Sequence, residues 1–211
     1  MQQTKRILEE RSTEIDSYFC YISSVENNTD MTVYKILKAN ILLMLYNCIE
    51  AVVSSSVDAI RNNIHKDSSV DFNCLKTEIK KQIIKDLKQN ISPEDFIRLC
   101  TEISRDIIKL SFKKENISKG NIDREVISSL AMVYGFNIKN SNYEETAHGN
   151  TLEIIKDKRN DLAHGLFSFA EIGKNYSTIE LEKLKDQTIK YLVFVVGEIE
   201  LYLSNKLYIH N

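Results

Sequence analysis

Two side chains of the segment KDKRNDLAHG, residues 156–165, have the chemical types needed for proton transfer at a phosphate. Arg159 is a permanent cation whose planar guanidinium suits a phosphate, or charge that develops at phosphorus. His164, separated from it by four residues, titrates near neutral pH and can accept a proton from an oxygen or donate one. Such a pair is sufficient for metal-free cleavage of RNA, in which the 2′-hydroxyl attacks its own phosphodiester.

The spacing of the two residues constrains how they meet. Five positions along an ideal helix rotate by about 500°, so the two side chains leave the axis roughly 140° apart. They share a face only if the helix loosens near its end, which Gly165 permits. Asn160 is a candidate for orienting the substrate or His164, or else a surface residue. The alternative interpretation makes Arg159 part of a structural salt bridge and His164 an ordinary residue of a C-terminal turn.

A polar stripe crosses an otherwise apolar helix expected over residues 31–65. It consists of Asn40, Asn47, Glu50 and Ser54, at three-, four- and seven-residue steps. Because a buried carboxylate is costly unless it is paired, we expect Glu50 to bind Arg159, with Asn47 beside them. The stripe could equally face solvent or a subunit interface.

The overall charge of the chain limits the kinds of partner it can hold. The 211 residues include 28 Lys and Arg against 30 Asp and Glu, a formal net charge of -2. This excludes the strongly basic profile of proteins that bind nucleic acid by charge alone, although Lys156 and Lys158 offer a local basic patch beside Arg159.

The composition also bears on metals, membranes and location. The four cysteines lie 26 to 28 residues apart without a C-x-x-C pair, which favours reduced thiols and predicts no metal site or cofactor. The N-terminus has no apolar signal-peptide core, and no apolar run is long enough to span a bilayer. We therefore expect a cytoplasmic protein without membrane partners.

Few turn-forming residues predict long helices and an all-α fold. The chain has six Gly and one Pro, which suits no all-β architecture. Apolar residues recur at helical spacing over 4–26, 31–65, 75–87, 92–112, 123–134, 151–163 and from 177 onward. We expect a four-helix bundle in a single domain, residues 1–211, with a core over about 1–65 and 147–208 and a helical insertion over about 66–146.

Several helix ends carry capping signals. Caps are expected within 27–30, at Asp123 and at Ser177, and helix stops at Gly135 and Gly165.

The segment R-N-D-L-A-H-G, residues 159–165, resembles the motif of the HEPN superfamily. Its ribonuclease members carry an Arg-x4-6-His motif, commonly with a polar residue after the arginine. The placement is also similar, since the motif lies in the penultimate helix, before a long apolar final helix and after an N-terminal helical hairpin. The resemblance covers roughly residues 1–65 and 147–208.

This resemblance implies an endoribonuclease that acts as a homodimer. The two motifs would meet across the interface in one composite cleft, and the products would carry a 2′,3′-cyclic phosphate and a 5′-hydroxyl. Such proteins are commonly toxins or effectors of bacterial toxin–antitoxin or anti-phage defence systems, which implies a cognate antitoxin or another defence-system partner. Some members are silenced by nucleotidyl transfer to a Tyr two residues after the motif His. Leu166 stands there in this chain.

A second hypothesis is a catalytically inactive HEPN-like helical module that binds a partner protein or nucleotide. The superfamily contains inactive members, so the fold alone does not establish activity. In an active dimer the two Arg159/His164 pairs should face each other in an open cleft.

Overall fold

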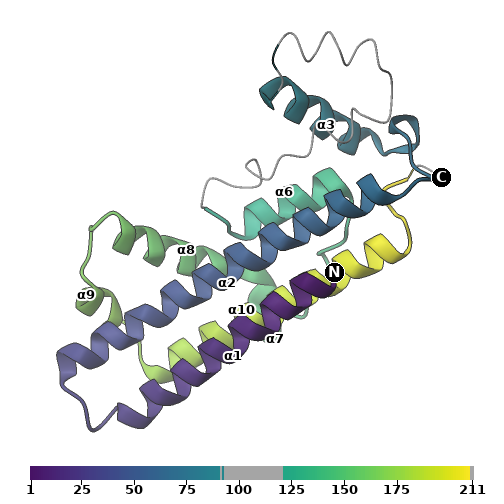
Figure 1. Cartoon of the computed structure of the whole chain (residues 1–211). Coiled ribbons are helices and arrows are strands. Elements are labelled where there is room, and N and C mark those ends of the chain that lie inside the picture. Colours follow the sequence, from purple (N-terminus) through teal and green to yellow (C-terminus); the bar gives the residue numbers. More distant parts are fainter. Residues whose placement is uncertain (91, 93–120, 210–211) are drawn as a thin grey trace.

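The computed structural model describes residues 1–90, 92 and 121–209, and it confirms the all-α class (Figure 1). The α-helices in this part are α1 (Gln2–Val25), α2 (Met31–Lys66), α3 (Thr77–Asn90), α6 (Arg124–Tyr134), α7 (Tyr143–Thr146), α8 (Asn150–Ala163), α9 (Phe169–Gly173) and α10 (Thr178–Ser204). Two short 3-10 turns, η1 (Phe72–Cys74) and η3 (Ala147–Gly149), lie between them. The helix expected over 92–112 falls outside the described residues.

Local capping chemistry sets the helix boundaries. The Asp30 carboxylate accepts hydrogen bonds from the first amides of α2, and Asp123 caps α6 in the same way. At the other end of α6, Gly135 adopts φ +90°, the left-handed conformation that ends a helix. Ser177 and Glu180 form a reciprocal capping box at the start of α10. These ends lie where the sequence predicts them.

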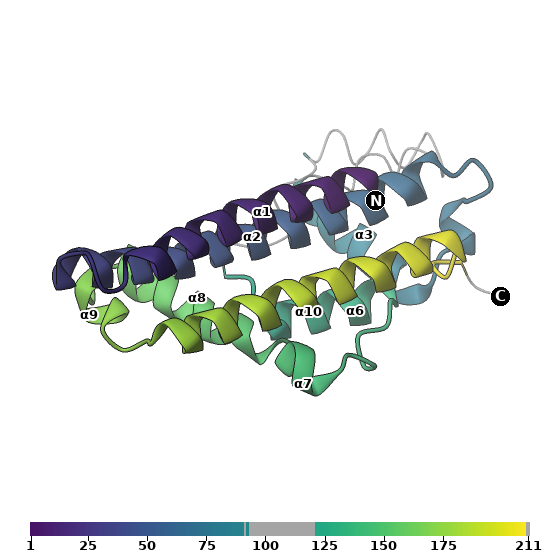
Figure 2. The ribbon, with the colours of Figure 1, turned by 90° about the horizontal axis from the view of Figure 1, so that it is seen from below.

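Helix α2 is the central helix of the structure. It packs against α1, α8, α9 and α10, and Figure 2 shows α1 and α10 lying along it. Its middle turns are fully buried through Ile41, Leu42, Leu45, Ile49 and Val52. By length and composition alone, α2 is also apolar enough to cross a membrane, but 56% of its most apolar window is buried inside the protein. That burial is what the core helix of a bundle shows.

The segment before and within α6 shares this core. Ile122, Ile127 and Tyr134 are buried with the side chains of the main helices. The Tyr134 hydroxyl accepts a hydrogen bond from Arg61 Nε of α2 at 2.9 Å, and its backbone oxygen accepts one from Tyr202 of α10 at 2.6 Å. Part of the segment expected as an insertion is therefore fastened to the bundle.

Two short helices, α7 and α9, lie in segments that the sequence predicts as connections. Helix α9 packs against the first half of α2, and the backbone of Gly173 approaches that of Lys35. The amine of Lys38, which is 8% exposed, donates to the backbone oxygen of Tyr176 just after α9. These contacts depend on the tertiary fold, which is why periodicity along the chain does not reveal them.

We predict that Gly173→Ala loosens α9 from α2. A Cβ at this position would lie 1.8 Å from the Lys35 carbonyl oxygen, so one of the two backbones must shift. We expect a loss of about 1–3 kcal/mol in the free energy of unfolding, measured by urea denaturation.

The matched control is Gly197→Ala, in the interior of α10, where an added Cβ meets nothing within 4 Å. Alanine is the better helix former, so this variant should be more stable than the wild type by about 0.5–1 kcal/mol. If both substitutions changed stability in the same direction, the close approach of α9 to α2 would be wrong.

Candidate active site

The C-terminal end of α8 places His164. The backbone amide of Leu166 donates to the backbone carbonyl oxygen of Asp161 at 2.9 Å. The backbone amide of Gly165 donates to the carbonyl oxygen of Leu162 at 3.2 Å. With Gly165 at φ +67°, this is a Schellman motif, in which glycine avoids the steric cost of the left-handed conformation. His164 is the C-cap residue of α8, and its side chain is exposed.

Arg159 lies five residues earlier, and its guanidinium packs against an aromatic ring. Its guanidinium carbon is 4.7 Å from the centroid of the Tyr46 ring of α2. One of its terminal nitrogens donates to Asn160 Oδ1 at 3.0 Å. A cation over a tyrosine face is attracted by the ring quadrupole by about 0.5–2 kcal/mol, depending on burial. The ring therefore fixes Arg159 without neutralising its charge.

Tyr46 and Asn160 also tie the chain that enters α6 to this site. The Tyr46 hydroxyl accepts a hydrogen bond from the buried Ile122 amide at 3.2 Å. Asn160 Nδ2 donates to Asn121 Oδ1 at 2.9 Å. Burial raises the pKa of Tyr46. The hydrogen bond from the Ile122 amide acts to lower this pKa. The nearby charge of Glu50 raises it, and that of Arg159 lowers it. Tyr46 is thus the contact point of α2, α8 and residues 121–122.

The expected ion pair between Glu50 and Arg159 is not formed. Among the described residues, neither side chain makes a salt bridge, and the Arg159 guanidinium lies on Tyr46, one helical turn before Glu50. Glu50 is only partly buried, so solvent reduces the cost of its charge and the physical reason for the expected pair is weaker. Asn47 is exposed on α2, and Asn40 and Ser54 are partly buried.

The two lysines that flank Arg159 are already paired. Lys156 binds Asp123, the cap of α6, at 2.7 Å, and Lys158 binds Asp161 at 2.8 Å. Burial opposes ionisation of Asp123, but the bonds from Lys156 and the Val126 amide outweigh it and lower the pKa of this carboxyl. The local basic patch expected here is therefore largely neutralised, and Arg159 is the cation of this segment that lacks a carboxylate partner among the described residues.

Arg159 and His164 do not contact each other in one chain. Helix α8 keeps its geometry through Ala163, so the two side chains leave its axis about 140° apart. Within the described part of the chain, the His164 ring takes part in no hydrogen bond or ion pair. One chain therefore presents a fixed cation and an exposed imidazole in different directions.

Among the residues that the structure describes, there is no group of three or more His, Cys, Asp or Glu side chains that could bind a metal ion. Cys20, Cys48 and Cys74 are free thiols. Burial raises the pKa of the Cys48 thiol to about 12, which makes it a core residue rather than a nucleophile.

Sequence reasoning did not identify Tyr46 or Asn121 as part of this site. The one available signal for Tyr46 is its position one turn before Glu50 in an apolar helix, where a buried tyrosine hydroxyl needs a partner. Asn121 offers no comparable signal.

We predict that Tyr46→Phe lowers the free energy of unfolding by about 1–3 kcal/mol, because the buried Ile122 amide loses its acceptor. Tyr46→Leu should cost more, since it also removes the ring beneath Arg159. Only Tyr46→Leu should shift the Arg159 Nε–H resonance strongly in NMR spectra.

The control is Tyr143→Phe, at a tyrosine that is 62% exposed, where a change within about 0.5 kcal/mol is expected. Equal effects of the Tyr46→Phe and Tyr143→Phe substitutions would contradict the bridging role of the Tyr46 hydroxyl.

Comparison with known proteins assigns the chain to a family. A model of the HEPN_MAE_28990-like HEPN family matches residues 2–208, which includes the middle segment as well as the two helix pairs. No curated protein and no solved structure matches the chain. HEPN domains are commonly ribonucleases or defence effectors. The match covers nearly the entire chain, and the all-α fold agrees with it, so the chain belongs to the HEPN_MAE_28990-like HEPN family.

Proposed function

We propose that this chain is a metal-independent endoribonuclease of HEPN type that acts as a homodimer in the cytoplasm. In this proposal it is a toxin or effector of a bacterial toxin–antitoxin or anti-phage defence system, controlled by an antitoxin or another defence-system partner. The observation that carries the proposal is the Arg159 guanidinium, fixed on Tyr46 and unpaired with any described carboxylate, five residues before an exposed histidine at the end of the same helix.

Each residue of the motif has a defined part in the proposed reaction. Arg159 binds the scissile phosphate and stabilises the charge that develops on it. The 2′-hydroxyl oxygen attacks phosphorus while the bond to the 5′-oxygen breaks. The 2′-hydroxyl loses its proton and the departing 5′-oxygen gains one; His164 carries out one of these two transfers and solvent the other. Asn160 holds the guanidinium in place, and Glu50 and Asn47 border the path of the substrate on α2.

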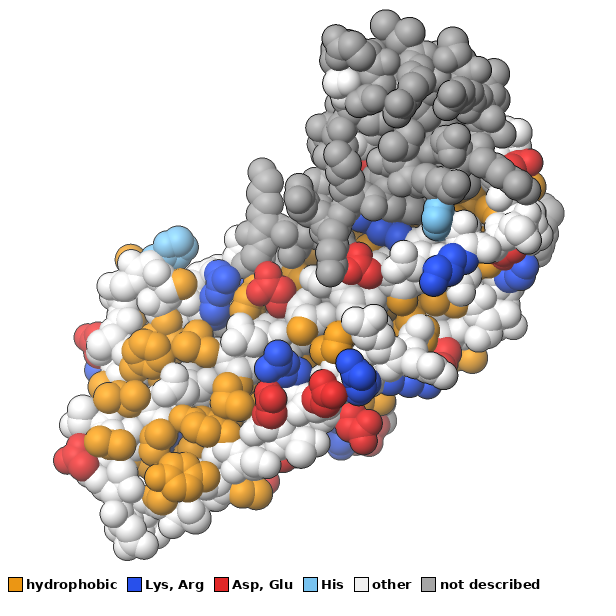
Figure 3. All heavy atoms as spheres, in the orientation of Figure 1, with side chains coloured by type: hydrophobic (Ala, Val, Ile, Leu, Met, Phe, Trp, Pro, Cys, Tyr) orange, Lys and Arg blue, Asp and Glu red, His pale blue; other side chains and the backbone are white. Residues whose placement is uncertain are grey.

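A second copy supplies what one chain lacks. Since Arg159 and His164 diverge in one chain, a two-fold arrangement that brings the ends of both α8 helices together would put both kinds of group around one phosphate. Large exposed apolar side chains lie next to this end, on the first turns of α2 and directly after the motif: Met31, Val33, Ile36, Leu166, Phe167 and Phe169. Figure 3 shows hydrophobic side chains gathered over this end of the molecule. We assign this apolar surface to the homodimer.

The first test is cleavage of a labelled RNA in EDTA. Arg159→Ala and His164→Ala should each reduce the rate at least about 100-fold, since each removes a group that acts in the transition state. Arg6→Ala, a control at an exposed arginine of α1, should cut like the wild type. The products should carry 2′,3′-cyclic phosphate ends.

Cleavage that survived both substitutions would show that the site is wrong. If folded, dimeric wild-type protein left all tested RNAs intact, this would favour the inactive binding module.

The second test concerns the dimer. Phe167→Glu puts a charge in the apolar surface, so we expect a monomer in analytical ultracentrifugation and a loss of cleavage. Val193→Glu, at a 55% exposed position on α10, is the matched control and should leave both properties unchanged. An active Phe167→Glu monomer would refute the composite site.

A further inference from the structure

One face of α2, exposed in part and covered at Arg61, remains polar beyond the candidate site. With about 100° of rotation per residue, six side chains fall within a sector of roughly 80°. They are Asn47, Glu50, Ser54, Asp58, Arg61 and His65. Tyr46, which carries Arg159, borders this sector. The polar face therefore leads from the site toward the C-terminal end of α2.

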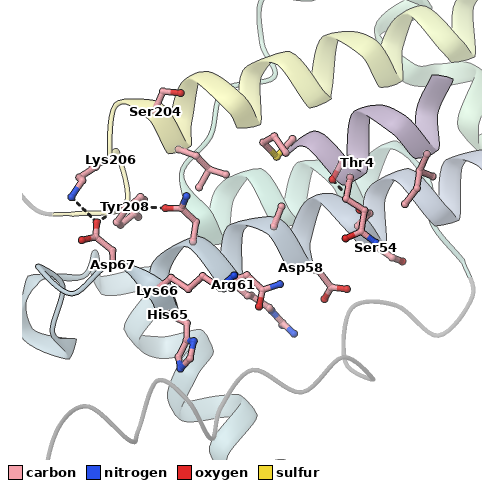
Figure 4. Close-up of a pocket in the computed structure, with 18 of the residues that line it drawn as sticks. Thr4, Ser54, Asp58, Arg61, His65, Lys66, Asp67, Ser204, Lys206 and Tyr208 are labelled. Carbon is pink, nitrogen blue, oxygen red and sulfur yellow. Dashed lines mark hydrogen bonds and ion pairs between the residues drawn. The ribbon is translucent and has the colours of Figure 1, made fainter. Parts of the chain in front are cut away.

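A cavity of about 1150 Å³ opens at that end, between the first turns of α1, the second half of α2, and the end of α10 with the residues that follow it (Figure 4). Among its described lining residues, hydroxyl, amide and charged side chains predominate, including Thr4, Ser54, Asp58, Asn62, His65 and Lys66. Its volume exceeds that of a typical small-molecule pocket of about 300–1,000 Å³, so it has room for more than one nucleotide unit.

The basic side chains of the cavity differ in whether they already form ion pairs with other residues of the protein. Lys206 binds Asp67 at 2.7 Å, and the buried Arg61 binds Asp86 at 3.3 Å. His65 and Lys66 are exposed, and within the described residues their side chains make no hydrogen bond or ion pair. Donors for an anionic group are thus concentrated at one end of the cavity.

The acidic Glu50 on the same face constrains the ligand. Its carboxylate would repel a phosphate backbone lying directly on α2, whereas carboxylates and amides hydrogen-bond readily to the edges of unstacked bases. A strand whose bases face α2, and whose phosphate reaches His65 and Lys66, satisfies both conditions. Duplex RNA does not present its bases in this way.

We propose that this cavity is a binding subsite for single-stranded RNA flanking the cleavage site, with a phosphate at His65 and Lys66 and the bases toward Asn62. The subsite rests on the proposed ribonuclease function. From Glu50 to His65 the helix rises about 22 Å, so the subsite takes nucleotides several positions from the scissile phosphate. It sets affinity for long substrates and leaves the chemical step unchanged.

The test compares a long single-stranded RNA with a short one that ends before the subsite. His65→Ala/Lys66→Ala should raise KM for the long RNA about 10-fold or more, with kcat unchanged, and should cleave the short RNA like the wild type. Lys190→Ala, at a 57% exposed lysine on α10, is the control and should affect neither substrate. Equal KM values of wild type and double variant on the long RNA would overturn the subsite while leaving the ribonuclease intact.

A binding arm separates this proposal from the failure of catalysis. With His164→Ala protein, long RNA that carries a photoreactive 4-thiouridine should crosslink to the cavity residues, and the double substitution should weaken its binding. This readout does not require cleavage. Crosslinks elsewhere would refute the subsite. So would tight binding of the four nucleoside 5′-monophosphates, combined with RNA affinity independent of length, since the cavity would then serve a free nucleotide.

Discussion

The contact between the Arg159 guanidinium and the Tyr46 ring holds the candidate site together. This contact joins α8 to the central helix α2. The hydroxyl of the same tyrosine accepts a hydrogen bond from the Ile122 amide, which fixes the chain that enters α6. An aromatic face attracts a cation without cancelling its charge, as a carboxylate would. The protein therefore positions Arg159 and still leaves its charge available to an anionic ligand.

The end of α8 places the motif histidine close in sequence to exposed apolar side chains. Gly165 allows the chain to turn sharply, which leaves His164 exposed at the helix end and directs Leu166 and Phe167 to the surface. Helix α9 then returns the chain to α2, where Gly173 and Lys38 fasten it. Because only a few residues separate the motif from the exposed apolar side chains, association of two chains through this surface would bring their motifs close together.

Helix class and most helix ends could be predicted because capping is local: the residues that fix them, such as Asp30, Asp123 and Gly135, act on amides or backbone angles within a few positions. Arg159 and His164 could be found because motif spacing is also local. The partner of Arg159 could not, because Glu50 and Tyr46 lie one turn apart on the same helix. Only the axial offset between α2 and α8, a tertiary property, decides which of them the guanidinium meets.

That offset has a chemical consequence. Had Arg159 met Glu50, the two charges would have formed a largely neutral pair, and a phosphate would have had to compete with a fixed carboxylate. In the observed arrangement Glu50 stays partly exposed on the outward face of α2, within range to influence Tyr46 but unbound to Arg159. Exposed apolar side chains lie on the first turns of α2, and mostly polar side chains line the cavity along its second half. Helix α2 can therefore support a protein contact at its first turns and a ligand along its second half. Between them lies Arg159, whose charge no described carboxylate neutralises.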